Sequence, residues 1–184
     1  ASAEHRQGGL LIASRWLGPG IAGVVVAAVA WHVTMLAVPR ALMHLAEHRI
    51  ASVAGINRMM HGAVVTAQSR AIVRPSPDLL YSTCVYNVSQ HPVLVDVEPV
   101  AAPYWSLSVF DRKTDVAFVR NNRQSGGAAI RVAILHVGQV APAGYAPVTV
   151  LGSSGVALVR ILIDRTKPID AIDAARRHST CRAA

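Results

Sequence analysis

The pattern of hydrophobic and polar positions divides the chain into three stretches. Residues 16–39 contain no Asp, Glu, Lys or Arg. Residues 40–62 continue with a helical period, and their apolar positions share one face: Leu42, Leu45, Ile50, Val53 and Ile56. From residue 63 onward, short alternating or β-branched runs are separated by turn residues, which is typical of strands. The pattern therefore predicts an apolar helix, a second helix and a β domain over residues 63–184.

The apolar stretch has the length of a membrane-spanning helix. A helix over residues 16–39 is about 36 Å long, and the hydrocarbon core of a bilayer is about 30 Å thick. Trp16, Trp31 and the flanking Arg15 and Arg40 are residues that anchor helix ends at lipid headgroups. The run is longer than the apolar core of a cleaved signal peptide. We therefore predict one uncleaved transmembrane helix, preceded by a polar segment at residues 1–15 and followed by a juxtamembrane helix at 40–62.

Two features of the apolar stretch go beyond anchoring. Its small residues recur at spacings of three and four, which places them on one helix face where a second helix can approach: Gly20, Gly23, Ala27, Ala30 and Thr34. Gly and Ala are also common in bilayer helices with no packing role. The second feature is His32, because ionisable residues inside a membrane are functional candidates. With Ala28 one turn earlier, His32 resembles the site where light-harvesting polypeptides ligate bacteriochlorophyll. The alternatives are a neutral His that bonds to a neighbouring helix or reaches the interface.

The remainder of the sequence predicts a mainly β fold. We expect strands within 64–73, 79–88, 92–100, 104–111, 116–122, 129–137, 148–152 and 155–164. Trp105, Leu107 and Val109 should face one way and Ser106 and Ser108 the other, with 116–122 as the hairpin partner. Short strands with frequent turns indicate an antiparallel sandwich or partial barrel. After Pro168 the spacing of Ile169 and Ile172 predicts a short C-terminal helix.

The two cysteines indicate the cellular compartment of the β domain. Cys84 lies in a predicted strand and Cys181 lies near the C-terminal end of the sequence, so a disulfide would pin the tail to the sheet. Two unrelated buried thiols are the alternative. Because disulfides persist in oxidising compartments, the bridge predicts a cytoplasmic N-terminus and a periplasmic β domain in a bacterial inner membrane.

The net charge and the distribution of basic residues indicate which kind of molecule the protein binds. The chain has 18 Lys and Arg against 10 Asp and Glu, a formal net charge of +8. The basic residues are scattered singly and have no interleaved aromatics, which argues against nucleic-acid binding. We expect the basic domain to lie beside anionic lipid or against an acidic protein surface.

Three segments together resemble a known family. They are PDLLYSTCVYNVSQHPVLVDVE, PYWSLSVFDRKTDVAFVRNNR and a late VLVRILID-like strand, followed by Cys181. They resemble domain of unknown function 1254 (DUF1254), in its short membrane-anchored form from alphaproteobacteria. The resemblance covers roughly residues 17–181, and its most specific part is residues 104–111 with Asn121 to Arg123. It implies a β-rich, membrane-bound extracytoplasmic protein, a bridge between Cys84 and Cys181, and no known reaction.

No catalytic constellation is apparent. Ser, His and Asp are present, but no G-x-S-x-G nucleophile elbow accompanies them. His44, Glu47 and His48 have a spacing that can hold a metal, yet an exposed helix face explains them better, and we expect no metal site. In the predicted hairpin we expect salt bridges or turn caps. A groove that binds a small anionic ligand is a further possibility, formed by Arg112, Arg120, Asn121 and Arg123.

Three functional hypotheses follow. The first is a non-catalytic accessory subunit without cofactors, which docks on a larger integral membrane complex through its helix and β domain. The second is a subunit of a photosynthetic or respiratory complex in which His32 touches bacteriochlorophyll or haem. The third is a periplasmic enzyme or binder of a small anionic ligand.

Overall fold

The computed structural model describes residues 4–66, 69, 74–164, 166 and 168–184, with the side chains of residues 4–15 left out. The chain divides into two compact units, Ala1–Pro39 and Arg40–Ala184. Helix α1 (Glu4–Ala54) begins in the first unit and ends in the second, and it includes one stretch long and apolar enough to cross a membrane, Trp16–Ala54. This supports the membrane anchor that the apolar pattern predicts. The helix continues through Pro39, so no separate second helix starts there.

Helix α1 ends earlier than the expected residue 62. Gly55 has a φ of 85° and its N–H donates to Ala51 O at 2.8 Å, a helix end that favours glycine. Asn57, with a φ of 56°, then holds the chain against a strand, because its side chain bonds to the backbone N–H and C=O of Asn87. The next residues form a short strand, β1 (Met59–His61), where helix was predicted. Of the strand predicted within 64–73, residues 64–66 are irregular and 67–68 and 70–73 lie outside the described residues.

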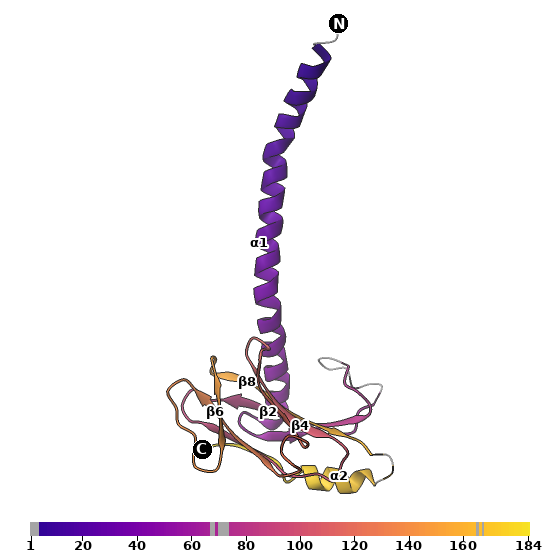
Figure 1. Ribbon diagram of the computed structural model, residues 1–184, viewed down its shortest axis with the longest axis vertical. Coiled ribbons are helices and arrows are strands. Elements are labelled where there is room, and N and C mark those ends of the chain that lie inside the picture. Colours follow the sequence, from indigo (N-terminus) through magenta and orange to yellow (C-terminus); the bar gives the residue numbers. More distant parts are fainter. Residues whose placement is uncertain (1–3, 67–68, 70–73, 165, 167) are drawn as a thin grey trace. The chain divides into compact units, whose positions relative to one another are not determined.

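The second unit contains a five-stranded antiparallel sheet, here called sheet A. Its order is β1-β2-β8-β4-β5, from β2 (Leu79–Asn87), β8 (Ser154–Leu162), β4 (Trp105–Asp111) and β5 (Val116–Asn121). Strands β4 and β5 form the expected hairpin, with an irregularity between Val109 and Phe110. In Figure 1, β2, β8 and β4 lie side by side, as the pairing requires.

A second sheet, sheet B, has the order β7-β6-β3-β9. It contains β3 (Val93–Val97), β6 (Ile130–His136), β7 (Ala146–Val150) and β9 (Thr180–Ala183). Strands β6 and β7 are parallel, so the sheet is mixed rather than purely antiparallel. Helix α2 (Ile169–Arg176) is the expected short C-terminal helix. The mainly β fold with one long N-terminal helix is confirmed.

One hydrophobic core joins the two sheets. Sheet A contributes Leu107 and Val109, sheet B contributes Val95 and Ile134, and α2 contributes Ile172. Ser106 and Ser108 alternate with Trp105, Leu107 and Val109 as predicted, but they are fully buried too. Residues 40–54 of α1 cover part of the other face of sheet A, where Met43 packs with Val85 and Val156.

Candidate functional site

A cavity of about 470 Å³ lies where residues 40–54 of α1 cross sheet A. Its lining combines helix residues with the facing ends of β2 and β8, among them His44, Glu47, His48, Tyr86, Asn87 and Ser154. Both histidines are exposed, whereas Glu47 is half-buried. A concave site with a few polar groups in an otherwise apolar lining is the usual form of a small-molecule site.

Glu47 is the most distinctive polar group of this cavity. Its Oε2 accepts a hydrogen bond from the Ser154 hydroxyl at 3.3 Å. Its Oε1 is buried and has no hydrogen-bond partner in the described part of the chain. A buried carboxylate oxygen without a partner is costly, so it is suited to a ligand that brings a donor. No group of His, Cys, Asp and Glu that could hold a metal occurs among the described residues.

Tyr86 closes the inner side of the same region. Its hydroxyl donates to Phe110 O at 2.9 Å across β8. The close passage requires Gly155, because a Cβ there would lie 2.1 Å from Phe110 O and 2.4 Å from Tyr86 Oη. Burial raises the pKa of Tyr86, and the carboxylates of Asp111 and Glu47 raise it further. Tyr86 is therefore a hydrogen-bond donor here and not a base.

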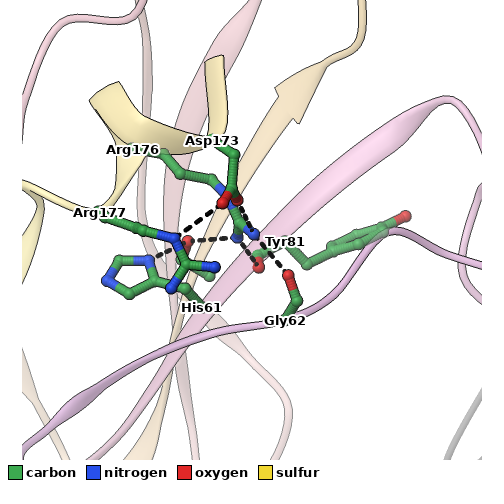
Figure 2. Close-up of polar contacts among 7 residues, drawn as sticks. His61, Gly62, Tyr81, Asp173, Arg176 and Arg177 are labelled. Carbon is green, nitrogen blue, oxygen red and sulfur yellow. Dashed lines mark hydrogen bonds and ion pairs between the residues drawn. The ribbon is translucent and has the colours of Figure 1, made fainter. Parts of the chain in front are cut away.

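A second polar cluster surrounds a buried arginine. Arg176 on α2 is only 1% exposed. Its guanidinium donates to Tyr81 O at 2.7 Å, to the Ser82 hydroxyl at 3.2 Å and to Gly62 O at 2.5 Å, and it pairs with Asp173 (Figure 2). Each of its three nitrogens has a partner, which is the arrangement of a structural clamp and not of an open anion site. The clamp ties α2 to β2 and to the residue after β1.

The cluster also shifts two pKa values. His61 lies on β1 with its Nδ1 2.9 Å from the Ser82 hydroxyl. Burial lowers the pKa of His61, and the cations Arg176 and Arg177 lower it further. Burial pushes the pKa of Asp173 up, but hydrogen bonds from Arg177 and Arg176 outweigh it and hold the pKa below its usual range. Although Ser82 and His61 resemble a nucleophile and its base, Ser82 is 1% exposed and cannot meet a substrate.

The disulfide is present between Cys84 on β2 and Cys181 on β9. Its two residues belong to different sheets, so the bridge crosses the core and fixes the C-terminal strand to sheet A. Both cysteines are buried. Of the two interpretations of the cysteine pair, the disulfide is thus the one adopted by the fold.

The structure does not bring the residues of the predicted anion groove together. Arg112 lies in the β4–β5 turn, whereas Arg120, Asn121 and Arg123 lie at the opposite end of β5. The Asp111 carboxylate caps this turn, since its Oδ1 accepts the N–H groups of Lys113 at 2.7 Å and Asp115 at 3.0 Å.

The two intramembrane features belong to the first unit. His32 donates from Nδ1 to Ala28 O at 2.8 Å, so this ring nitrogen is bonded within its own helix. The predicted packing face lies on α1, and a Cβ at Gly20 or Gly23 would meet no atom within 4 Å. A hollow of about 450 Å³ follows the helix surface at Gly20, between Trp16 and Val24.

Sequence reasoning missed the polar roles of Glu47, Tyr86 and Arg176. The sequence places Asp173 three and four residues before Arg176 and Arg177, a spacing that predicts ion pairs but not the burial of one arginine. For Tyr86 the only signal is Gly155, a glycine at the start of a β-branched run, which suggests a close approach without saying by what.

Comparisons with known proteins describe a family and a fold. A family model described as "Protein of unknown function (DUF1254)" matches residues 56–183. A search of curated proteins finds no match.

Two solved structures are similar in fold. The VPA0106 protein from Vibrio parahaemolyticus superposes with a TM-score of 0.63 at 14% identity, over 83% of this chain and 36% of that one. An uncharacterised protein from Burkholderia cenocepacia gives a TM-score of 0.46 at 14% identity, over 73% of this chain and 37% of that one. This chain thus spans little more than a third of either protein.

Proposed function

The chain belongs to the DUF1254 family, which assigns no reaction, and from the structure we propose that it is a membrane-anchored accessory subunit without catalytic activity. In this proposal α1 holds the protein in the membrane while its β domain docks on an integral membrane protein. The partner has an acidic surface, which complements the net charge of +8.

The observation that carries the proposal is the outer edge of sheet A. Strand β5 is the last strand in the order β1-β2-β8-β4-β5, and β4 is its partner in the sheet. Val116 and Val119 on this strand are 57% and 48% exposed. An exposed hydrophobic edge strand readily pairs with another chain, and proteins that remain alone usually shield such edges. Arg120 and Arg123 at its end add positive charge toward an acidic partner.

The helix supports the same conclusion. Its small residues Gly20, Gly23 and Ala27 lie at helical spacing, which lets a second helix backbone approach closely, and the helix surface is hollow at Gly20. In VPA0106 the similar fold makes up 36% of the chain, so in that protein it adjoins a longer remainder. A partner subunit beside the β domain would occupy a comparable place here.

Docking is tested on the full chain extracted gently from native membranes. We expect a stoichiometric complex by size-exclusion chromatography and mass spectrometry. Val116→Ser with Val119→Ser should release the partner, because the exposed edge loses its apolar contacts. Val137→Ser with Val140→Ser is the matched control, since these valines are 62% and 82% exposed in the β6–β7 loop. A wild-type chain that elutes as a monomer contradicts the proposal.

The proposed location is the periplasmic side of a bacterial inner membrane, with residues 1–15 in the cytoplasm. It rests on the Cys84–Cys181 bridge, which requires oxidising conditions. Protease added to intact spheroplasts should digest the β domain and leave a protected fragment that contains the apolar part of α1. Protection of the whole chain until lysis would place the domain on the cytoplasmic side instead.

One observation favours a second function, a pigment- or haem-associated subunit. Because His32 donates from Nδ1 to its own helix, Nε2 is the ring nitrogen left to bind a tetrapyrrole metal. A purified complex should then absorb in the visible range, and His32→Leu should remove the absorbance while the complex stays intact. A colourless complex excludes this function.

A further inference from the structure

A small basic pocket lies in the second unit and shares no lining residue with the cavity at Glu47. It has a volume of about 290 Å³ and is lined by Arg40, Asp111, Arg112, Lys113, Leu151 and Gly152. These residues come from α1, from the β4–β5 turn and from the β7–β8 turn. Two segments that are distant in sequence, α1 and the β4–β5 turn, therefore place three cations around one space, and the β7–β8 turn completes the lining.

The single carboxylate in the lining of the pocket, that of Asp111, already accepts hydrogen bonds from the backbone. Asp111 is 6% exposed, and its Oδ1 accepts the backbone N–H groups of Lys113 and Asp115. Its role is to shape the turn, in which Thr114 has a φ of 70°. The carboxylate thereby shapes the turn that carries Arg112 and Lys113, and cations outnumber anions in the lining.

The side chain of Arg112 occupies space that is open because residue 152 is a glycine. A Cβ at Gly152 would lie 2.9 Å from Cγ and 3.1 Å from Cδ of Arg112, so the arginine stem packs directly on the glycine backbone. Such packing restricts a side chain that is otherwise free on a turn, and a pre-organised arginine loses less entropy when it binds an anion. Leu151, 79% exposed, adds an apolar group beside the cations.

The place of Arg40 in the sequence relates the pocket to the predicted membrane surface. Arg40 is the first charged residue after the apolar residues 16–39, and the phosphates of a bilayer lie where such a stretch ends. Arginine and lysine are the side chains that bind phosphate, and clusters of them next to a membrane helix attract anionic lipids.

We propose that this pocket binds the phosphate of an anionic lipid headgroup. Arg112, Lys113 and Arg40 surround the phosphate, and Leu151 contacts the adjoining apolar part of the lipid. The site depends on the membrane anchor and not on a protein partner, so it can be correct even if the docking proposal fails.

The test is native mass spectrometry of the full chain in detergent with phosphatidylglycerol or phosphatidylcholine added. We expect the wild type to retain phosphatidylglycerol preferentially. Arg112→Gln with Lys113→Gln should weaken this binding about tenfold or more, because each cation near a lipid surface contributes about 1 kcal/mol. Arg120→Gln with Arg123→Gln removes the same charge at the far end of β5 and should leave the binding within about twofold of wild type.

A charge-neutral variant makes the test sharper. Gly152→Ala keeps every cation but displaces the stem of Arg112, so it should also weaken phosphatidylglycerol binding. If Arg112→Gln with Lys113→Gln and Arg120→Gln with Arg123→Gln weaken binding equally, the attraction is a property of net charge and the pocket is not the site. Unchanged binding in Gly152→Ala and in Arg112→Gln with Lys113→Gln overturns the proposal as well.

Titration with inorganic phosphate separates the two sources of phosphate. The lipid site predicts that phosphatidylglycerol binds tightly while inorganic phosphate displaces it poorly, since free phosphate makes no contact with Leu151. If inorganic phosphate binds as tightly as the lipid, the ligand is a soluble anion and the lipid assignment is wrong.

Discussion

Arg176 shows how one charged side chain can be held inside a β domain. The carbonyls of Gly62 and Tyr81, the Ser82 hydroxyl and the Asp173 carboxylate surround it and satisfy its nitrogens. We expect Arg176→Met to lower the free energy of unfolding by about 3 kcal/mol, because it leaves several buried acceptors without a donor. Urea unfolding of the full chain in detergent, followed by the fluorescence of buried Trp105, measures this.

Arg177→Met is the control for that measurement. Arg177 also pairs with Asp173, but its side chain is 54% exposed, so its loss should cost no more than about 1 kcal/mol. Equal effects of the two substitutions would mean that burial of Arg176 contributes nothing.

His61, in the same cluster, should make the stability of the fold depend on pH. Because its pKa is lower in the folded protein than the usual 6.5, the unfolded chain takes up the proton first as pH falls. The free energy of unfolding should therefore decline as the pH drops from above 6.5 through the folded pKa. His61→Gln should reduce this decline, whereas His91→Gln, at an exposed position, should not. Urea midpoints over this pH range provide the comparison, and identical slopes in wild type and His61→Gln would refute the assignment.

At the scale of elements, the sequence predicts those that carry a strong periodic pattern. The alternation in residues 104–111 and the turn that follows give β4 and its hairpin partner β5, and Pro168 gives the start of α2. The four-residue strand β9 has one buried side chain, Cys181, and so has no pattern to detect. The early end of α1 depends on contacts between Asn57 and Asn87, which sequence periodicity does not encode.

The candidate sites also divide into those with a local signal in the sequence and those that depend on tertiary contacts. Cys84 and Cys181 are identifiable because cysteines are few, and His32 because it interrupts an apolar run. The lining of the cavity at Glu47 and of the basic pocket comes from segments that are joined only by the fold, as Arg40, Arg112 and Gly152 are. No local spacing relates such residues, and the predicted groove grouped Arg112 with Arg120 and Arg123, which lie at the other end of β5.

The centre of sheet A depends on one glycine. Gly155→Ala would force a Cβ against Phe110 O and Tyr86 Oη, so β2, β8 and β4 cannot keep their present spacing. We expect a loss of about 2 kcal/mol or more in the free energy of unfolding. Tyr86→Phe, which removes only the hydrogen bond to Phe110 O, should cost about 1 kcal/mol. If both variants unfold at the wild-type urea concentration, the close contact is not a constraint.

At the scale of the whole molecule, the disulfide joins residues separated by 97 positions. On the chain-entropy model, closing so long a loop stabilises the folded state by about 4–5 kcal/mol. Cys84→Ala with Cys181→Ala should lower the urea midpoint accordingly, and dithiothreitol should lower the midpoint of the wild type but not that of the variant. A wild type insensitive to dithiothreitol in the unfolding transition would show that no bridge contributes.

The position of β8 in sheet A determines when the domain can fold. This strand lies between β2 and β4 and pairs with both, yet it is made only after residue 153 has been synthesised. Until then β2 and the β4–β5 hairpin have no common neighbour, and the inner faces of both sheets stay uncovered. Folding of the β domain must therefore follow its translation, and non-local pairing of this kind is slow. A chain already inserted through α1 would spend that interval beside the membrane with Trp105 and its apolar neighbours exposed. Exposed apolar surface of this kind is prone to aggregation, so we expect a chaperone to bind the β domain at this stage.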